Sequence, residues 1–240
     1  MKKLFAVLFI ALNLATGAFA QTDKDYKDLL TLFVGEKYEK CLYKADDYML
    51  GDDTKKDPLP YLYTSRCYYE MSKLDQYKEK YPNSFKDAMK YISKYGSKVK
   101  EKKYAAEYED FFGELRAAAI AEAETMMDTQ KYSKAKQLYD QILDMDPNDA
   151  GAQLMLGLAF GAMKSKKESE TAIQKAKALL TDKKASQAKE QLSLLKEALT
   201  RHASALAEGN KSAAKEWLDL GMEYFKDDRE YQVTYETIAG

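Results

Sequence analysis

The sequence predicts an all-α protein in which helix-turn-helix pairs stack into a solenoid, and three observations support this fold class. The 240 residues include only four prolines and are 45% apolar, a composition that suits an all-helical chain. Apolar residues recur at the spacing of one buried helical face in segment after segment. The same size pattern also returns at a constant offset of 47 positions, at Cys41, Ala88 and Ala135. The chain is therefore expected to repeat one structural unit.

The clearest unit runs from residue 119 to residue 149 and is predicted to be two helices closed by a stop. Ala123 in the first helix is small enough to let a neighbouring helix come close. In the second helix, Ala135 and Tyr139 lie one turn apart on the same face. Pro147 cannot continue a helix and forces the residue before it into an extended conformation, so the unit ends there.

The remaining helices are predicted from the same periodicity and from their breakers. Gly35 ends the first helix, and Ser84 is expected to be the N-cap of the fourth. Residues 72–83 form an insertion that a regular repeat would not contain. The segments predicted to be helical are 23–34, 36–49, 59–71, 85–95, 104–127, the stretch from 132 to the stop at 146–147, 150–163, 166–180, 184–207, 212–225 and 230–238.

The unit that ends at Pro147 resembles the tetratricopeptide repeat (TPR), in which an aromatic residue, an alanine and a tyrosine precede a closing proline. Trp217, Leu220, Gly221 and Tyr224 also match the first-helix signature W-x2-L-G-x2-Y of that family. The resemblance implies a right-handed superhelix in which some repeats are elongated or degenerate. Its domain would cover residues 21–240, in approximate units 23–50, 58–97, 101–147, 150–181, 184–209 and 211–240.

The resemblance also implies where a partner would bind. TPR proteins bind extended or helical peptides in a concave groove, which is lined from the first helix of each pair. The positions that match are Arg66, Tyr69, Glu124, Met127 and Leu158. This set is mixed and amphipathic, and it lacks the Lys/Arg carboxylate clamp of chaperone-binding TPRs. The implied partner is a protein or a peptide.

The first twenty residues are predicted to be a secretory signal peptide. Lys2 and Lys3 precede an apolar run at 4–14, and Ala18 and Ala20 form an A-x-A cleavage signal. The apolar run is too short to span a bilayer. We therefore expect an exported bacterial protein, periplasmic in a Gram-negative-type cell, with a secreted or surface-associated protein as the alternative.

Cys41 and Cys67 are the only cysteines, and they admit two interpretations. Export would allow a disulfide between them. Alternatively, both are small buried residues that pack as hydrophobes.

Nothing in the sequence predicts catalysis, a metal site or a cofactor. His202 is the single histidine and has no cysteine cluster near it, and no phosphate-binding, nucleophile-elbow or metalloprotease motif occurs. The formal net charge of −1 and the scarcity of arginine give no reason to expect a nucleic-acid partner. We therefore expect no enzyme activity.

Two functional hypotheses remain. The first is a non-enzymatic protein-interaction or scaffold module of the bacterial cell envelope. The second is a glycan- or peptidoglycan-binding envelope protein in which exposed tyrosines and Trp217 stack on sugars. The insertion at 72–83, with Tyr77 and Tyr81 among charged residues, is a second candidate surface or else a solvated loop.

Overall fold

The computed structural model describes residues 26–99 and 108–239, and every regular element within these two ranges is a helix. The all-α prediction is therefore confirmed, while the predicted signal peptide lies outside the described residues. The helices are α1 (Lys27–Val34), α2 (Tyr38–Leu50), α3 (Leu59–Lys73), α4 (Asp75–Lys78), α5 (Ser84–Lys98), α6 (Glu109–Asp128), α7 (Tyr132–Met145), α8 (Ala150–Ala162), α9 (Lys166–Thr181), α10 (Lys189–Ala207), α11 (Lys211–Phe225) and α12 (Arg229–Ala239).

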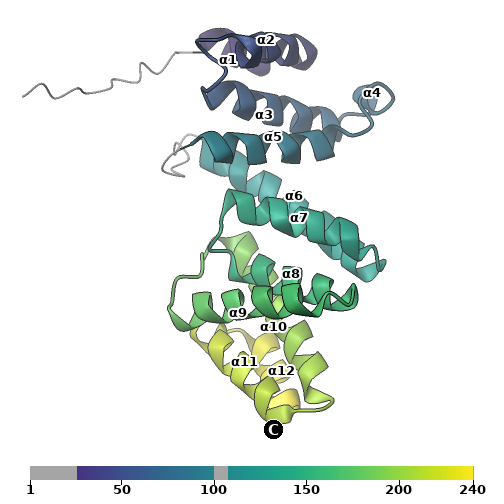
Figure 1. Ribbon diagram of the computed structural model, residues 1–240, viewed down its shortest axis with the longest axis vertical. Coiled ribbons are helices and arrows are strands. Elements are labelled where there is room, and N and C mark those ends of the chain that lie inside the picture. Colours follow the sequence, from purple (N-terminus) through teal and green to yellow (C-terminus); the bar gives the residue numbers. More distant parts are fainter. Residues whose placement is uncertain (1–25, 100–107, 240) are drawn as a thin grey trace, which may run out of the picture.

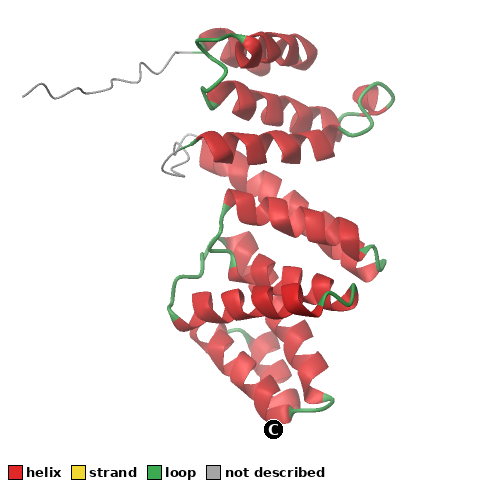
Figure 2. Cartoon of the chain, viewed as in Figure 1, coloured by secondary structure: helices red, strands yellow, loops and turns green. Residues whose placement is uncertain are grey.

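The helices form pairs that follow one another along the long axis of the molecule (Figure 1 and Figure 2). The pairs are α1 with α2, α3 with α5, α6 with α7, α8 with α9, and α11 with α12. Neighbouring pairs meet because α2 also packs on α3, and α7 also packs on α8. The unit predicted at 184–209 contains one helix, α10, and not a pair. Helix α10 packs on α8 and on α11. This arrangement is the predicted solenoid of helix pairs.

Several predicted helix starts differ from the structure, and two of the differences have a clear local reason. Helix α10 begins at Lys189 and not at residue 184, because the backbone N–H of Ser186 donates to a carbonyl of the loop before α8, at 3.0 Å. Ser84 is the first residue of α5 and not its N-cap. Its hydroxyl donates to the carbonyl three residues earlier, at 2.7 Å, and therefore does not accept a backbone N–H of the helix.

The two departures from a regular repeat are a long helix and an insertion. The helix predicted over 104–127 is α6, which in the described part of the chain begins at Glu109 and ends at Asp128. The insertion at 72–83 contains the short helix α4, which stands out from the stack in Figure 1.

The recurring small residues lie inside the helix pairs. Cys41 in α2, Ala88 in α5 and Ala135 in α7 are each 0% exposed. In α9, Ser169 takes the same position, and its hydroxyl donates to the carbonyl of Gly157 in α8 at 2.8 Å. A larger side chain at these positions would push the paired helix away. This constraint explains why the repeated pattern keeps its residue sizes while the residue types change.

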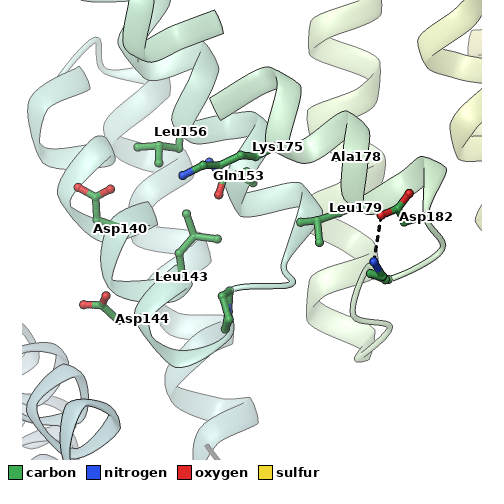
Figure 3. Close-up of a pocket in the computed structure, with 11 residues that line it drawn as sticks. Asp140, Leu143, Asp144, Gln153, Leu156, Lys175, Ala178, Leu179 and Asp182 are labelled. Carbon is green, nitrogen blue, oxygen red and sulfur yellow. Dashed lines mark hydrogen bonds and ion pairs between the residues drawn. The ribbon is translucent and has the colours of Figure 1, made fainter. Parts of the chain in front are cut away.

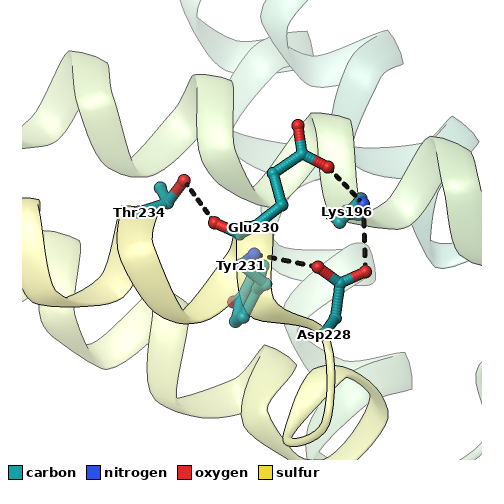
Figure 4. A network of polar contacts seen from close by, with 5 residues as sticks. All are labelled: Lys196, Asp228, Glu230, Tyr231 and Thr234. Carbon is teal, nitrogen blue, oxygen red and sulfur yellow. Dashed lines mark hydrogen bonds and ion pairs between the residues drawn. The ribbon is translucent and has the colours of Figure 1, made fainter.

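Tyr231 joins the two helices of the last pair, and Lys196 fixes this pair to the stack. Tyr231 of α12 is 1% exposed, and a Cβ added at Gly221 of α11 would overlap its hydroxyl group. Lys196 of α10 contacts Asp228 at 3.0 Å and Glu230 at 2.7 Å (Figure 4). Asp228 also accepts the backbone N–H of Tyr231 at 2.9 Å, so it satisfies a free donor at the start of α12.

Aromatic rings span the junction between the α3/α5 pair and the α6/α7 pair. The ring of Tyr69 in α3 lies 5.9 Å from that of Phe111 in α6, in an edge-on arrangement. The ring of Tyr95 in α5 also lies 5.9 Å from that of Phe112 in α6. Edge-on and offset ring contacts of this kind are favourable over a range of geometries. Large side chains therefore carry the contact of α6 with the helices before it.

His202 is a packing residue of α10, and its burial predicts a measurable pH effect. It is 7% exposed, with its ring edge-on to Trp217 of α11 at 4.7 Å. Burial lowers the pKa of His202 to about 4 from its ordinary 6.5. Between these values the unfolded chain binds a proton that the folded chain does not. The free energy of unfolding therefore falls as the pH falls through this window, by about 1.4 kcal/mol per pH unit.

We expect urea unfolding at pH 7 and at pH 4.5 to show a stability loss in the wild-type protein that is about 2–3 kcal/mol larger than in His202→Leu. The difference between the two proteins is the relevant quantity, because Asp149 acts in the opposite direction. Burial raises the pKa of Asp149 to about 6. The contribution of this carboxyl to the free energy of unfolding is therefore lost as the pH rises through that value. An identical pH dependence of the two proteins would contradict the prediction.

Candidate functional site

The five residues that the resemblance assigned to a groove lie in three different environments. Tyr69 of α3 and Met127 of α6 are buried in the core, at 8% and 9% exposure. Glu124 of α6 and Leu158 of α8 are partly buried. Burial raises the pKa of the Glu124 carboxyl, and the charges of Glu197 and Arg201 on α10 act on it as well. Only Arg66 of α3 lines the cleft described next.

Arg66 lies in a cleft between α1, α3 and α6 and is surrounded by aromatic rings. Its guanidinium carbon lies 4.0 Å from the ring centroid of Phe33, 5.3 Å from that of Tyr108 and 5.9 Å from that of Phe111. Its Nε is buried and has no hydrogen-bond partner among the described residues. The cleft has a volume of about 410 Å³ and is lined by Phe33, Val34, Glu36, Tyr38, Arg66, Glu70, Asp110, Phe111 and Glu114. We call it the Arg66 cleft.

The Arg66 cleft carries an excess of carboxylates. Lys73 pairs with Glu70 at 2.7 Å and lies 3.9 Å from Glu114. Glu36 and Asp110 line the same cleft, and neither makes an ion pair within residues 26–99 and 108–239. Arg66 makes no ion pair in these ranges either. The cleft therefore offers one fork of N–H donors among aromatic rings, beside carboxylates that attract positive charge.

Two tyrosines of the insertion at 72–83 contact α2, although α4 itself stands out from the stack. The ring of Tyr77 lies 6.2 Å from Tyr38 of α2, edge-on, and 6.3 Å from Tyr81. The hydroxyl of Tyr81 donates to the Glu39 carboxylate of α2 at 2.9 Å, and Lys80 contacts the same oxygen. Both tyrosines of this candidate surface are therefore partly used in packing.

The structure brings Cys41 of α2 and Cys67 of α3 together as free thiols. Both are 0% exposed. The Cys41 thiol donates to the carbonyl of Leu29 at 3.6 Å. Burial, with a hydrogen bond to Cys41, raises the pKa of the Cys67 thiol. In this form the two residues act as the small buried hydrophobes of the second interpretation.

The described residues contain neither a candidate metal cluster nor a membrane-spanning helix. In residues 26–99 and 108–239, no three His, Cys, Asp or Glu side chains are grouped so that they could hold a metal ion. Within the same ranges no helix has the length and apolar character needed to cross a membrane.

Comparisons with known proteins find similarity among solved structures. No protein-family model and no curated protein matches the chain. Among solved structures, the chain is similar to the crystal structure of the C-terminal part of a TPR repeat-containing protein from Cytophaga hutchinsonii. The identity is 13%, the match covers 88% of this chain and 99% of that chain, and the TM-score is 0.31. A similarity at this TM-score carries no argument about what this chain binds.

Proposed function

We propose that this chain is a non-enzymatic protein-interaction module, exported to the bacterial cell envelope, that binds an extended segment of a partner protein in the Arg66 cleft. The observation that carries the proposal is the Arg66 guanidinium, which lies over the Phe33 ring inside a cleft and has no ion-pair partner among the described residues. An arginine always bears its charge and its five donors, so a cleft of this kind favours a ligand with oxygen acceptors. The predicted signal peptide supports the proposed location.

The charges around Arg66 narrow the chemistry of the ligand. A free carboxylate would be repelled by the carboxylates of Glu36 and Asp110, whereas a backbone carbonyl is neutral and still accepts a hydrogen bond from the guanidinium. A lysine or arginine side chain next to that carbonyl would be attracted by the same acids. The proposed ligand is therefore an extended peptide with a basic residue beside the carbonyl that Arg66 binds.

The glycan-binding alternative has less support. Trp217, its best stacking platform, is 6% exposed and packs edge-on against His202. A sugar ring stacks on an exposed aromatic face. Tyr43 is 65% exposed and offers one such face.

The proposal is tested by selection from a phage-displayed library of short random peptides. We expect the wild-type protein to enrich peptides that contain lysine or arginine, and Arg66→Gln to lose this enrichment. Arg229→Gln, which changes an exposed arginine at the start of α12, is the matched control and should behave as wild type. Asp110→Lys, also at an exposed residue, should abolish the preference for basic peptides.

Thermal unfolding of each variant would establish that the loss is not a loss of fold. Failure to enrich any peptide, or the same peptides with Arg66→Gln as with wild type, would overturn the proposal. Sedimentation of the protein with purified sacculi, unaffected by Arg66→Gln, would favour glycan binding instead.

A further inference from the structure

A second hollow lies on a different part of the stack, between α7 and α9 with α8 as its floor. It has a volume of about 630 Å³. Asp140, Leu143 and Asp144 line it from α7, Leu156 from α8, and Lys175 and Leu179 from α9 (Figure 3). We call this hollow the α8 groove. None of these residues belongs to the Arg66 cleft, so the two sites can be tested separately.

The α8 groove runs along nearly the whole of α9. A smaller hollow of about 250 Å³ shares Leu156 and Lys175 with it and extends to Lys167. On α9 the lining therefore runs from Lys167 to Asp182, which at 1.5 Å per residue is roughly 22 Å. This length corresponds to about four turns of a bound helix.

Where α7 and α9 face each other across the leucines, their unpaired charges are opposite, while Glu168 adds one acid near the start of the α9 wall. On α7, Asp144 is exposed and has no ion-pair partner among the described residues, while Asp140 pairs with Lys136 at 2.7 Å. On α9, Lys175 is exposed and likewise unpaired in the described part of the chain. Asp182 at the end of this wall is compensated by Lys184 at 3.0 Å (Figure 3). The apolar side chains Leu143, Leu156 and Leu179 lie between the two walls.

The walls also determine which backbone conformation a ligand can have. Both walls are helices, whose interior N–H and C=O groups are already paired and cannot extend a hydrogen-bond ladder to a bound strand. Unlike the Arg66 cleft, the leucines offer no side-chain donor for a peptide carbonyl, so an extended peptide lying on them would leave those backbone groups without a protein partner. A helix satisfies its backbone internally and can present one apolar stripe to the leucines.

We propose that the α8 groove binds an amphipathic helix of a partner protein, with basic residues along one flank of its apolar stripe and acidic residues along the other. The basic flank lies against Asp140 and Asp144, and the acidic flank lies against Lys175. The apolar stripe covers Leu143, Leu156 and Leu179. The partner is thus recognised by the division of its charge between two flanks, and not by its net charge.

The test uses three fluorescein-labelled synthetic helices of about 16 residues, a length that matches the groove. They share one leucine stripe and differ only in their flanks, which are Arg on one side with Glu on the other, Arg on both sides, or Glu on both sides. Fluorescence anisotropy with the full chain should show that the divided peptide binds about five- to tenfold more tightly than either of the others. The divided peptide with a central proline should not bind.

Two groove variants distinguish this site from any other surface. Lys175→Glu makes both walls acidic, so the peptide with Arg on both sides should become the tightest ligand. Lys40→Glu makes the same change at an exposed residue of α2 and should leave the order of affinities as in wild type. Ala178→Trp, at an exposed residue of α9 that lines the groove, should fill it and abolish binding.

Circular dichroism would verify that these surface variants fold. The proposal is overturned if no peptide binds, if Lys175→Glu leaves the order of affinities unchanged, or if Ala178→Trp binds as wild type does. Equal binding of the proline-containing peptide would show that the ligand is not helical and would overturn it too.

Discussion

Replacing Gly151 by alanine is expected to destabilise the protein by about 3 kcal/mol, the upper end of what a single added carbon costs in a packed core. Gly151 lies in the first turn of α8, where α8 meets α10. A Cβ at this position would lie 2.7 Å from the backbone nitrogen of Leu195 and 2.9 Å from the carbonyl carbon of Leu194. These are backbone atoms of α10, which cannot rotate away as a side chain can. The two helices would have to separate.

The matched control is the same substitution at Gly113 in the interior of α6. There the nearest atom to an added Cβ is a carboxylate oxygen of Glu190, at 3.9 Å. Because glycine weakens a helix interior, Gly113→Ala should raise stability by about 0.5–1 kcal/mol. Urea unfolding of the two variants should therefore move the midpoint in opposite directions. A wild-type midpoint for Gly151→Ala would contradict the close packing of α8 on α10.

Replacing Arg116 by methionine is expected to cost about 2–3 kcal/mol. Arg116 of α6 is 8% exposed, and its guanidinium contacts the Glu190 carboxylate of α10 at 2.5 Å. Removing one member of a buried pair leaves the other charge desolvated and unpaired, which costs about 3–5 kcal/mol when both groups are fully buried. The Glu190 side chain is 20% exposed, so the expected loss is somewhat smaller.

The double variant Arg116→Met, Glu190→Met should recover most of this loss. It replaces an ion pair by two apolar side chains of similar length, an exchange that is often neutral in buried sites. We expect its free energy of unfolding to lie within about 1 kcal/mol of wild type. Equal destabilisation of the single and the double variant would contradict this expectation. It would mean that the ion pair itself stabilises the fold, and that the unpaired Glu190 carboxylate is not the cause of the loss. A double-mutant cycle from urea unfolding measures this directly.

The helix pairs could be predicted from the sequence because the size of a residue at a helix contact is constrained locally. Cys41, Ala88 and Ala135 lie 47 positions apart and are all fully buried where one helix meets another. The start of α10 could not be predicted in the same way. Residues 184–188 have no proline or glycine, yet Ser186 bonds to the loop before α8 and keeps them out of the helix.

The candidate site could be predicted only in part. Arg66 was found because the resemblance to TPR proteins marks one residue on α3. Phe33, Asp110 and Phe111 were missed, because they reach the same cleft from α1 and α6, and the sequence does not show which helices converge there. The residue type of Phe33 does not indicate a binding site, since a phenylalanine also fits the apolar stripe of an ordinary amphipathic helix. The α8 groove was missed for a related reason, as it depends on the space between α7 and α9.

The ring-bridged junction at α6 has a mechanical consequence for the molecule. Rings in edge-on contact can slide over one another while they keep most of their attraction, whereas helices whose backbones touch cannot. We therefore expect the contact of α3 with α6, where Tyr69 meets Phe111, to yield more readily than the contact of α8 with α10 at Gly151. Phe111 of this contact also lines the Arg66 cleft. A partner segment bound in this cleft would therefore restrict bending between the two ends of the molecule.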